Sequence, residues 1–278
     1  MRSSGLNTRV IFLIGFLIAG SLSGCATGKW SFIDKDEKVV FQRQFDEATP
    51  FGDGLAGVKV GDKWGFIDKH GTIIIEPQFE GVWRFHDGLA AVMVGGKWGF
   101  IDKAGKLVIQ PQFADASYFS EGLAPSETGG KWGYIDKAGK YAIPAQFDYA
   151  WHFQEGFAAV KKGGKWGFID KNGQIVIQPQ FEGVLSFSEG LAGILQGSKR
   201  GFIDKTGKIV IPAKFDNVLS FAEGLAPVKI GLQWGYIDKT GNMVILPQFE
   251  FAFPFSEDQA PVKVGYKWGY IFKTGQFA

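Results

Sequence analysis

The chain alternates short apolar runs with polar turns. In one stretch, an apolar run (89–94) ends at Gly95-Gly96, an alternating run (98–102) follows, and a third run (106–109) begins after a second turn. Short runs with a period of two, bounded by glycines, are typical of β-strands. In the second turn, Asp102 and Gly105 are spaced as in a type I turn followed by a left-handed residue, which is a common hairpin connection. The pattern therefore predicts three antiparallel strands in this stretch.

A fourth strand is possible in the segment from Phe79 to Phe85. Because side chains alternate between the two faces of a strand, Phe79, Gly81, Trp83 and Phe85 would then share one face. The segment could equally be an extended loop. The unit is therefore predicted to be a three- or four-stranded antiparallel meander, and the chain to be all-β.

The whole pattern recurs every 34 residues. A fixed period over most of a chain indicates a solenoid, a propeller or a linear array, in which each unit packs on its neighbours. A helical repeat is excluded, because glycine and proline inside a helix cost roughly 1 and 3 kcal/mol and both occur inside the units. One position marks the period: Trp30, Trp64, Trp98, Trp132, Trp166, Arg200, Trp234 and Trp268.

Three apolar positions keep their residue type from unit to unit. A buried aromatic side chain removes about 150–250 Å² from water, so its position tolerates little change. We therefore predict that these positions form the core. They are Phe45, Phe79, Phe113, Phe147, Phe181, Phe215 and Phe249; Phe51, Phe85, Phe119, Phe153, Phe187, Phe221 and Phe255; and Ile33, Ile67, Ile101, Ile135, Ile169, Ile203, Ile237 and Ile271.

Two charged positions also repeat. A parallel β-helix would stack identical charges about 4.8 Å apart, so hairpin units placed side by side or around a ring are predicted instead. The acids are expected to cap turns. One carboxylate per unit without other oxygen donors is weak evidence for calcium, and no metal site is predicted. The two ladders are Lys35, Lys69, Lys103, Lys137, Lys171, Lys205, Lys239 and Lys273, and Asp53, Asp87, Glu121, Glu155, Glu189, Glu223 and Glu257.

The tryptophan position behaves differently, because Arg200 replaces tryptophan in one unit. An unpaired guanidinium is costly to bury. The position is therefore predicted to be partly exposed. A row of such tryptophans would either stack on sugar rings or a partner's apolar side chains, or cap each hairpin.

The residues between the two phenylalanine ladders vary most from unit to unit. A scaffold needs a constant core, whereas a binding face needs diversity, and aromatic residues and arginine carry much of the energy of interfaces. Relaxed packing around a loop would explain the variation equally well. Together with Arg200, the candidate binding residues are Trp83, Arg84, His86, Tyr149, Trp151 and His152, which would cluster if adjacent units touch.

The first residues have a different character. Two arginines precede an apolar run (10–19) that is too short to span a bilayer, which is typical of a signal peptide. The following Leu22-Ser23-Gly24-Cys25 resembles the bacterial lipoprotein cleavage box, and Cys25 is the only cysteine. We therefore predict a signal peptide (1–24), removed before Cys25, and a bilayer anchor formed by acylation of Cys25. Ala26 then implies the outer membrane in a host with two membranes.

Cleavage also changes the charge balance. It removes Arg2 and Arg9 and no acid, which leaves 28 basic and 28 acidic residues. Nucleic-acid binding relies on clustered positive charge, so no nucleic-acid partner is predicted. With a single thiol the chain has no internal disulfide, and its stability must come from packing.

No pattern of catalytic residues accompanies the repeats. The three histidines fall at different positions of their units, without Asp, Glu or Cys at metal-ligand spacing. There is no Gly-x-Ser-x-Gly elbow and no phosphate-binding loop. Paired carboxylates of different units are the one catalytic arrangement left open. We therefore expect a protein that is not an enzyme and has no cofactor.

The recurring Lys-Trp-Gly-Phe-Ile-Asp-Lys, the Asp-Lys-x-Gly turn and the Glu-Gly-Leu-Ala stretch resemble the WG-repeat, or KWG-repeat, family of bacterial proteins. The resemblance runs from Lys29 to the end of the chain, with departures at Ser31, Arg200 and Phe272. It implies a β-rich repeat protein, often of the envelope, and supplies no common activity or site residues.

These observations predict a short tether (25–28) and a repeat domain (29–278) with seven full repeats and a partial eighth. An open, twisted array of meanders is preferred over a closed, propeller-like ring of seven. The predicted function is a lipid-anchored, non-catalytic binding or scaffold module of the cell envelope, with a protein or glycan partner. The alternative is an accessory protein or weak hydrolase that acts on cell-wall or other glycans.

Overall fold

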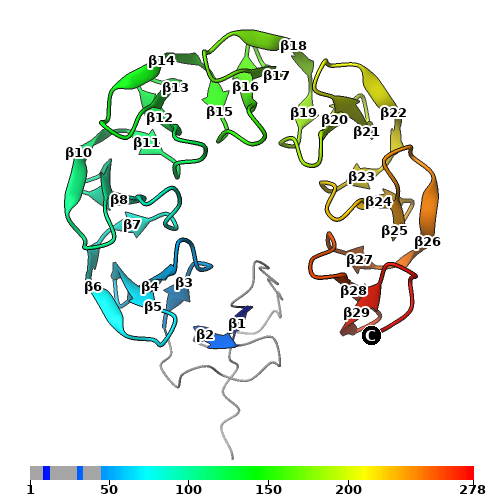
Figure 1. The fold of residues 1–278 in the computed structure, drawn as a ribbon, viewed down its shortest axis with the longest axis horizontal. Helices are drawn as coiled ribbons and strands as arrows, with labels where there is room; N and C mark the ends of the chain where they lie inside the picture. Colours follow the sequence, from blue (N-terminus) through cyan, green and yellow to red (C-terminus); the bar gives the residue numbers. More distant parts are fainter. Residues whose placement is uncertain (1–8, 13–29, 34–44) are drawn as a thin grey trace, which may run out of the picture. The chain divides into compact units, whose positions relative to one another are not determined.

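The computed structural model of the chain describes residues 9–12, 30–33 and 45–278, and every regular element in these residues is a β-strand (Figure 1). The part of the chain so described contains no helix that could cross a membrane. Strand β1 (Arg9–Phe12), which falls in the predicted signal peptide, pairs in parallel with β2 (Trp30–Ile33). The lipidation site Cys25 and the tether (25–28) lie outside the described residues.

The repeats form two compact units, Met1–Ala145 and Gln146–Ala278. Most sheets have four strands in chain order, and the last has three. The first unit contains β3 (Glu47–Ala48), β4 (Leu55–Val60), β5 (Lys63–Asp68), β6 (Ile73–Phe79), β7 (Gly81–Val82), β8 (Ala90–Val94), β9 (Lys97–Ile101), β10 (Leu107–Phe113), β11 (Asp115–Ala116), β12 (Ala124–Thr128) and β13 (Lys131–Ile135); β14 (Tyr141–Phe147) crosses the boundary.

The second unit repeats the same order of strands. It contains β15 (Tyr149–Ala150), β16 (Ala158–Lys162), β17 (Lys165–Ile169), β18 (Ile175–Phe181), β19 (Gly183–Val184), β20 (Leu191–Gln196), β21 (Lys199–Asp204), β22 (Ile209–Phe215), β23 (Asn217–Val218), β24 (Ala226–Ile230), β25 (Gln233–Ile237), β26 (Met243–Phe249), β27 (Phe251–Ala252), β28 (Gln259–Val264) and β29 (Lys267–Phe272). The prediction of an all-β tandem array of antiparallel meanders is confirmed. The open or closed path of the array stays a prediction.

The segment after Phe79 supplies the short first strand of the next sheet, because β7 pairs antiparallel with β8. Of the two alternatives for this segment, a single strand over 79–85 that puts Phe79, Gly81, Trp83 and Phe85 on one face does not form. Phe79 and Phe85 are buried, whereas Trp83 is 44% exposed. The physical reason is that Phe79 ends one sheet and Gly81 begins the next, so the four residues do not belong to one strand.

The fourth strand of each four-stranded sheet is longer than the sequence indicates. Strand β10 continues through Pro111 to Phe113, with register shifts against β9. Proline is tolerated there because β10 lies at the edge of its sheet and needs no further ladder partner. On the neighbouring strand β9, Gly99 of the Trp-Gly pair must be glycine, because an added Cβ would lie 2.6 Å from the carbonyl oxygen of Ile109.

The Asp-x-x-Gly turns form as predicted. In the turn after β9, Asp102 Oδ1 accepts hydrogen bonds from the amides of Ala104 and Lys106, at 3.0 and 2.9 Å. Gly105 adopts a φ of 81°, a left-handed value that favours glycine. The turn is thus closed by its own aspartate, which accounts for the recurrence of the pair.

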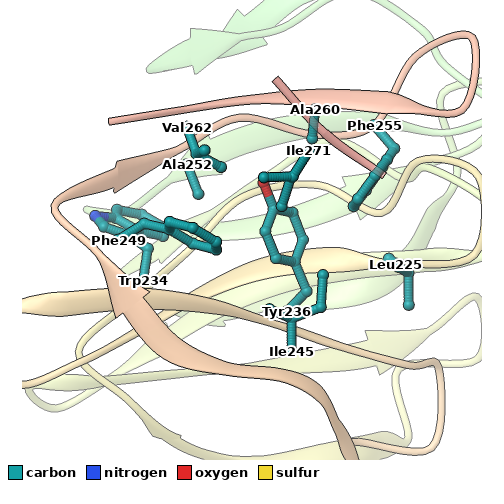
Figure 2. Close-up of a cluster of buried hydrophobic side chains, with 10 residues drawn as sticks. All are labelled: Leu225, Trp234, Tyr236, Ile245, Phe249, Ala252, Phe255, Ala260, Val262 and Ile271. Atoms are coloured by element: carbon teal, nitrogen blue, oxygen red, sulfur yellow. The ribbon is translucent and has the colours of Figure 1, made fainter. Parts of the chain in front are cut away.

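The hydrophobic core lies between consecutive sheets within each unit. In the second unit, Tyr236 of one sheet packs against Phe255 of the next, with ring centroids 5.0 Å apart (Figure 2). In the first unit, Phe100 and Phe119 make the same contact at 4.9 Å. From Phe45 onward, all members of the three apolar ladders are buried except Phe51, which is partly exposed. The core prediction is confirmed, and each sheet depends on its neighbour for burial.

Candidate functional site: aromatic rows and the links between repeats

A cross-strand row runs over each sheet, from a variable residue on the short first strand to the tryptophan position on the third strand. In the sheet β15–β18, Tyr149 is opposite Lys161, and Lys161 is opposite Trp166. The other rows are Glu47–Lys59–Trp64, Gly81–Met93–Trp98, Asp115–Glu127–Trp132, Gly183–Leu195–Arg200, Asn217–Lys229–Trp234 and Phe251–Lys263–Trp268.

The row of Tyr149 borders an open hollow of about 390 Å³. Its lining consists of Asp148, Tyr149, Lys161, Gly164 and Trp166, and we call it the Tyr149 hollow. The rings of Tyr149 and Trp166 are 6.0 Å apart and meet edge to face at 70°. Tyr149 is 43% exposed. The hollow therefore combines two aromatic rings with a carboxylate and an ammonium group.

The predicted binding residue Trp151 does not line this hollow but contacts Trp166, which does. Its ring lies 5.3 Å from that of Trp166, and it packs on the core cluster of its unit. His152 is partly exposed and follows directly in the chain. Trp151 is thus a packing residue that orients Trp166, whereas Tyr149 provides the exposed ring.

In four sheets, the acid that precedes the row accepts a hydrogen bond from the hairpin turn of that sheet. Glu80 accepts hydrogen bonds from the amides of Gly95 and Gly96, at 3.0 and 2.9 Å. These amides hold the pKa of Glu80 below its usual range. Asp216 likewise accepts from Gly231 at 2.7 Å. The acid therefore orders the hairpin turn next to the row that it precedes.

In the first unit, Trp83, Arg84 and His86 divide between two surfaces. The ring of Trp83 stacks on Trp98 of its own sheet, with centroids 6.5 Å apart and planes at 28°. Arg84 lies over the ring of Tyr118 of the next sheet, with Cζ 4.7 Å from the centroid. The ring of His86 is 5.6 Å from the same tyrosine. Arg84 and His86 therefore converge on Tyr118, whereas Trp83 packs beside the row Gly81–Met93–Trp98 through Trp98.

The six variable candidates do not lie on consecutive sheets. Trp83, Arg84 and His86 belong to the first unit, next to the sheet β7–β10. Tyr149, Trp151 and His152 belong to the second unit. Along the chain, the sheet β11–β14 lies between the two groups. The structure thus describes two separate groups, and a common cluster stays a prediction.

The exposure of the tryptophan position varies from sheet to sheet. Trp64, Trp98, Trp166 and Arg200 are partly exposed, and Trp268 is 39% exposed. The prediction of a partly exposed position is confirmed for these five. It is wrong for Trp132 and Trp234, which are 8% and 3% exposed. At Trp234, the ring of Phe251 packs 5.4 Å from the indole.

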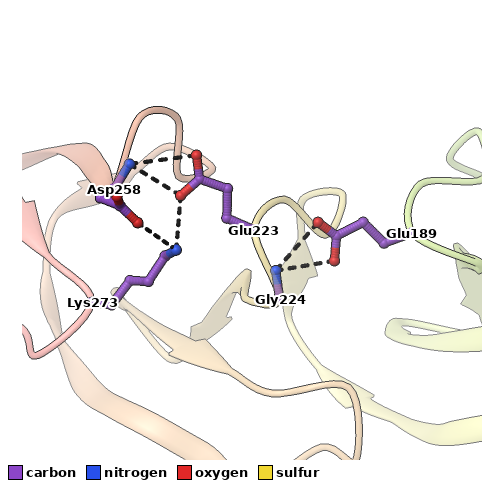
Figure 3. A network of polar contacts seen from close by, with 5 residues as sticks. All are labelled: Glu189, Glu223, Gly224, Asp258 and Lys273. Carbon is purple, nitrogen blue, oxygen red and sulfur yellow. Dashed lines mark hydrogen bonds and ion pairs between the residues drawn. The ribbon is translucent and has the colours of Figure 1, made fainter.

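The acidic ladder joins each sheet to the next. Glu189 accepts from the amide of Gly224, 35 residues later, at 3.0 Å, and its carboxylate lies 3.0 Å from Lys239 Nζ. Glu223 binds the amide of Asp258 at 3.1 Å and Lys273 at 2.9 Å in the same way (Figure 3). In the first unit, Asp53 and Asp87 cap the following turns at 2.7 Å.

The predicted turn capping is therefore confirmed, and the two charged ladders form one set of links. The capped turn belongs to the following sheet, which the sequence alone did not indicate. Within the described residues, no group of His, Cys, Asp or Glu is arranged to hold a metal ion.

The family model described as "WG containing repeat" matches residues 30–64, 64–98, 98–132, 132–166, 166–199, 201–231 and 234–268. These matches cover most of the chain. The chain belongs to the WG-repeat family. No protein of curated function matches its sequence.

Solved structures resemble this WG-repeat chain in fold alone. Hsv2p of Kluyveromyces lactis is 9% identical, with 81% of this chain and 96% of Hsv2p aligned and a TM-score of 0.51. The dihydro-heme d1 dehydrogenase NirN, in complex with DHE, is 11% identical over 81% of this chain and 63% of NirN, with a TM-score of 0.52. PorZ of Porphyromonas gingivalis, a bacterial surface component, is 9% identical with a TM-score of 0.42, and 83% of this chain spans 37% of PorZ.

The rows also explain the exceptional unit of this WG-repeat protein. Arg200 is opposite Leu195, whereas a lysine is opposite the tryptophan in four of the other rows. Leucine at this position avoids two like charges side by side. Both Arg200 and Leu195 can be read from the sequence, but only the strand register shows that they are neighbours.

Proposed function

We propose that this WG-repeat protein is a non-catalytic binding module of the bacterial cell envelope, anchored through Cys25, and that its exposed aromatic rows bind a glycan. The observation that carries the proposal is the Tyr149 hollow, in which two rings meet a carboxylate and an ammonium group. A protein partner is the alternative for the same surface.

The chemistry of the hollow suits a sugar better than a purely apolar ligand. Binding sites for small molecules combine aromatic walls with a few polar groups that fix orientation. Tyr149 and Trp166 present ring faces and edges to the apolar side of a sugar, and Lys161 is positioned to donate hydrogen bonds to its hydroxyl groups. A hollow of about 390 Å³ lies within the range of small-molecule sites, which is about 300–1,000 Å³.

The carboxylates of the acidic ladder support a non-catalytic role. Burial opposes ionisation of Glu155, but the ammonium group of Lys205 and the amide of Gly190 outweigh it, and the pKa of Glu155 is lowered. A general acid of a glycosidase needs the opposite shift. The engaged acids therefore act as structural links in this proposal, and hydrolysis of glycans is not expected.

The proposal is tested by co-sedimentation of the mature protein with peptidoglycan sacculi and by titration with soluble envelope polysaccharides. Tyr149→Ala and Lys161→Ala are expected to weaken binding about tenfold or more, as for residues at the centre of an interface. The matched controls are Asn217→Ala and Lys229→Ala, which change the same two positions of another row. Sugar release is measured in the same samples.

Two results would contradict the proposal. Equal loss in the two pairs of variants would exclude the Tyr149 hollow as the site. Retention of no glycan by the wild-type protein, together with capture of an envelope protein by a photo-crosslinking residue at position 149, would replace the glycan by a protein partner.

A further inference from the structure

The sheet β7–β10 carries a pair of accessible tryptophans that are not part of the Tyr149 hollow. The ring centroids of Trp83 and Trp98 lie 6.5 Å apart, with the ring planes at 28°. Trp83 is 44% exposed, and Trp98 is partly exposed. The described sheets β3–β6 and β11–β14 precede and follow this sheet along the chain. The pair, which we call the Trp83–Trp98 platform, is therefore accessible although both neighbouring sheets are present.

The backbone and the core hold both rings of the platform in place. The amide of Trp83 donates a hydrogen bond to the carbonyl oxygen of Ala91 at 2.9 Å. Trp98 is opposite Met93 in the sheet and packs on a core cluster of the first unit. A surface that is ordered before a ligand arrives loses little conformational freedom on binding. The platform is therefore suited to binding a rigid ring.

Gly81 leaves the ring of Trp98 open. Gly81, Met93 and Trp98 form one cross-strand row, and glycine contributes no side chain to cover the indole. A Cβ added to Gly81 would lie 3.4 Å from Cη2 of Trp98 and 3.6 Å from Cβ of Met93, which are ordinary contacts. Gly81 also lacks the left-handed backbone that favours glycine. The fold therefore does not require glycine here, and its effect is to keep the ring accessible.

The row beneath the platform contains no charged side chain. Gly81, Met93 and Trp98 are uncharged, whereas every other described row contains at least one Lys, Arg, Asp or Glu. The preceding Glu80 accepts hydrogen bonds from two amides of its hairpin turn. An ionic ligand therefore finds no counter-charge in this row.

Both indoles of the platform keep a hydrogen-bond donor for a ligand. Among the residues that the structure describes, neither Trp83 nor Trp98 has an acceptor for its indole N–H. A ligand that covers the rings also covers these donors, and a donor buried without a partner is costly. A purely apolar ligand is thus disfavoured. The fitting ligand combines an apolar face for the rings with uncharged oxygen acceptors for the N–H groups.

We propose that the Trp83–Trp98 platform is a second ligand site and that it binds an uncharged sugar ring. The C–H face of the sugar packs on the indoles, and its oxygens accept hydrogen bonds from the indole N–H groups. This inference rests on the proposed glycan-binding function and adds a substrate class to it. The Tyr149 hollow contains Asp148 and Lys161 and belongs to the other compact unit, so the proposal gives the chain two sites of different chemistry.

The first experiment is a titration of the full-length mature protein, ¹⁵N-labelled at its tryptophan indoles, with neutral hexasaccharides of glucose and of N-acetylglucosamine. The N–H signals of the platform are assigned with Trp83→Phe and Trp98→Phe. We expect both signals to shift and to saturate with at least one neutral sugar. Absence of a shift with both sugars would overturn the proposal. A shift with choline chloride or hexagalacturonate alone would replace the neutral sugar by a charged ligand and overturn it too.

The second experiment covers the platform without removing any of its groups. Gly81→Leu places a side chain over the ring of Trp98 and is expected to weaken binding of the neutral sugar about tenfold. Gly183→Leu is the matched control, because it changes the same position of another row, where a Cβ would lie 3.4 Å from Cβ of Leu195. Thermal unfolding checks that both variants are folded. Equal affinity of the two variants for the sugar would contradict the assigned site.

The failure of this proposal can be distinguished from the failure of the proposed function. Tyr149→Ala should leave the shifts of the platform signals unchanged, because Tyr149 belongs to the other compact unit. Loss of these shifts in Tyr149→Ala would mean one shared site and would overturn the inference. Binding to sacculi that depends on Tyr149, with a silent platform, would overturn the inference alone. A responsive platform, with sacculi binding unaffected by Tyr149→Ala and Lys161→Ala, would support the inference and reject the Tyr149 hollow.

Discussion

The sheets β23–β26 and β27–β29 have closely similar sequences but differ in how much they bury. Trp234 is 3% exposed and Tyr236 is inaccessible to solvent, whereas the equivalent Trp268 is 39% exposed and Tyr270 is partly exposed. The last sheet lacks a fourth strand, and Phe277 covers part of its face by a bridge to Ile271. The same residues are core in one sheet and surface in the next, because only the first has a following repeat.

This difference shows that a single WG repeat does not contain its own core. The burial of each sheet, and the capping of each turn, come from its neighbours. The stability of such an array is close to a sum of repeat and nearest-neighbour terms. Changes that act on a link between sheets should therefore cost more inside the array than at its end.

The largest expected effect is a charge placed at the buried tryptophan position. Trp234→Arg should lower the free energy of unfolding by about 3–5 kcal/mol, because the guanidinium would be buried next to Lys229, its cross-strand neighbour. Trp268→Arg should cost about 1 kcal/mol or less, because that position is exposed. Chemical denaturation followed by circular dichroism measures both.

The natural Arg200 suggests the control for this experiment. Adding Lys229→Leu to Trp234→Arg reproduces the Leu195–Arg200 pair and should recover part of the loss. Equal destabilisation by Trp234→Arg and Trp268→Arg would show that the following repeat does not determine the burial of this position.

A smaller effect is expected from the acidic ladder. Glu189→Ala removes the acceptor of the Gly224 amide and the partner of Lys239, and should cost about 1–3 kcal/mol. Glu257→Ala changes a residue with the same left-handed backbone, at φ 53° against 52°, but without a described partner. The difference between their denaturation midpoints isolates the link, and equal midpoints would reject it.

The smallest effect is the dependence of one link on pH. Because the pKa of Glu155 is lowered in the folded chain from an ordinary value of 4.5, its contribution is complete above that pH. It should be lost as the pH falls through the lowered folded value. The stability difference between wild type and Glu155→Gln should therefore shrink below pH 4.5, and a difference that grows on acidification would contradict the assigned link.

Much of the fold followed from periodicity. The β-strands around Gly95-Gly96, the Asp102 turn and the buried phenylalanine ladders are local or repetitive features, and the structure has them as predicted. The segment after Phe79 was ambiguous, because seven residues with alternating apolar character do not reveal that one sheet ends and another begins within them.

The candidate site was only partly predictable. Tyr149 and Trp83 were identified as exposed aromatic residues of the variable segment, and both are. Their pairing with Trp166 and Trp98 was not foreseen, because it depends on the strand register. The grouping of Trp83 with Tyr149 rested on contact between adjacent units, and the structure places a further sheet between them in the chain.

The sequence by itself determined the repeat length, the all-β class, the identity of the core positions and the turns, because these depend on local propensity and on periodic burial. Only the tertiary structure decided with which repeat each side chain packs or forms hydrogen bonds. The acids of one repeat cap the turns of the next, and each phenylalanine fills the core of two sheets. Such partnerships join residues 19 to 50 positions apart, and their distances follow from the packing of whole sheets rather than from the chain pattern.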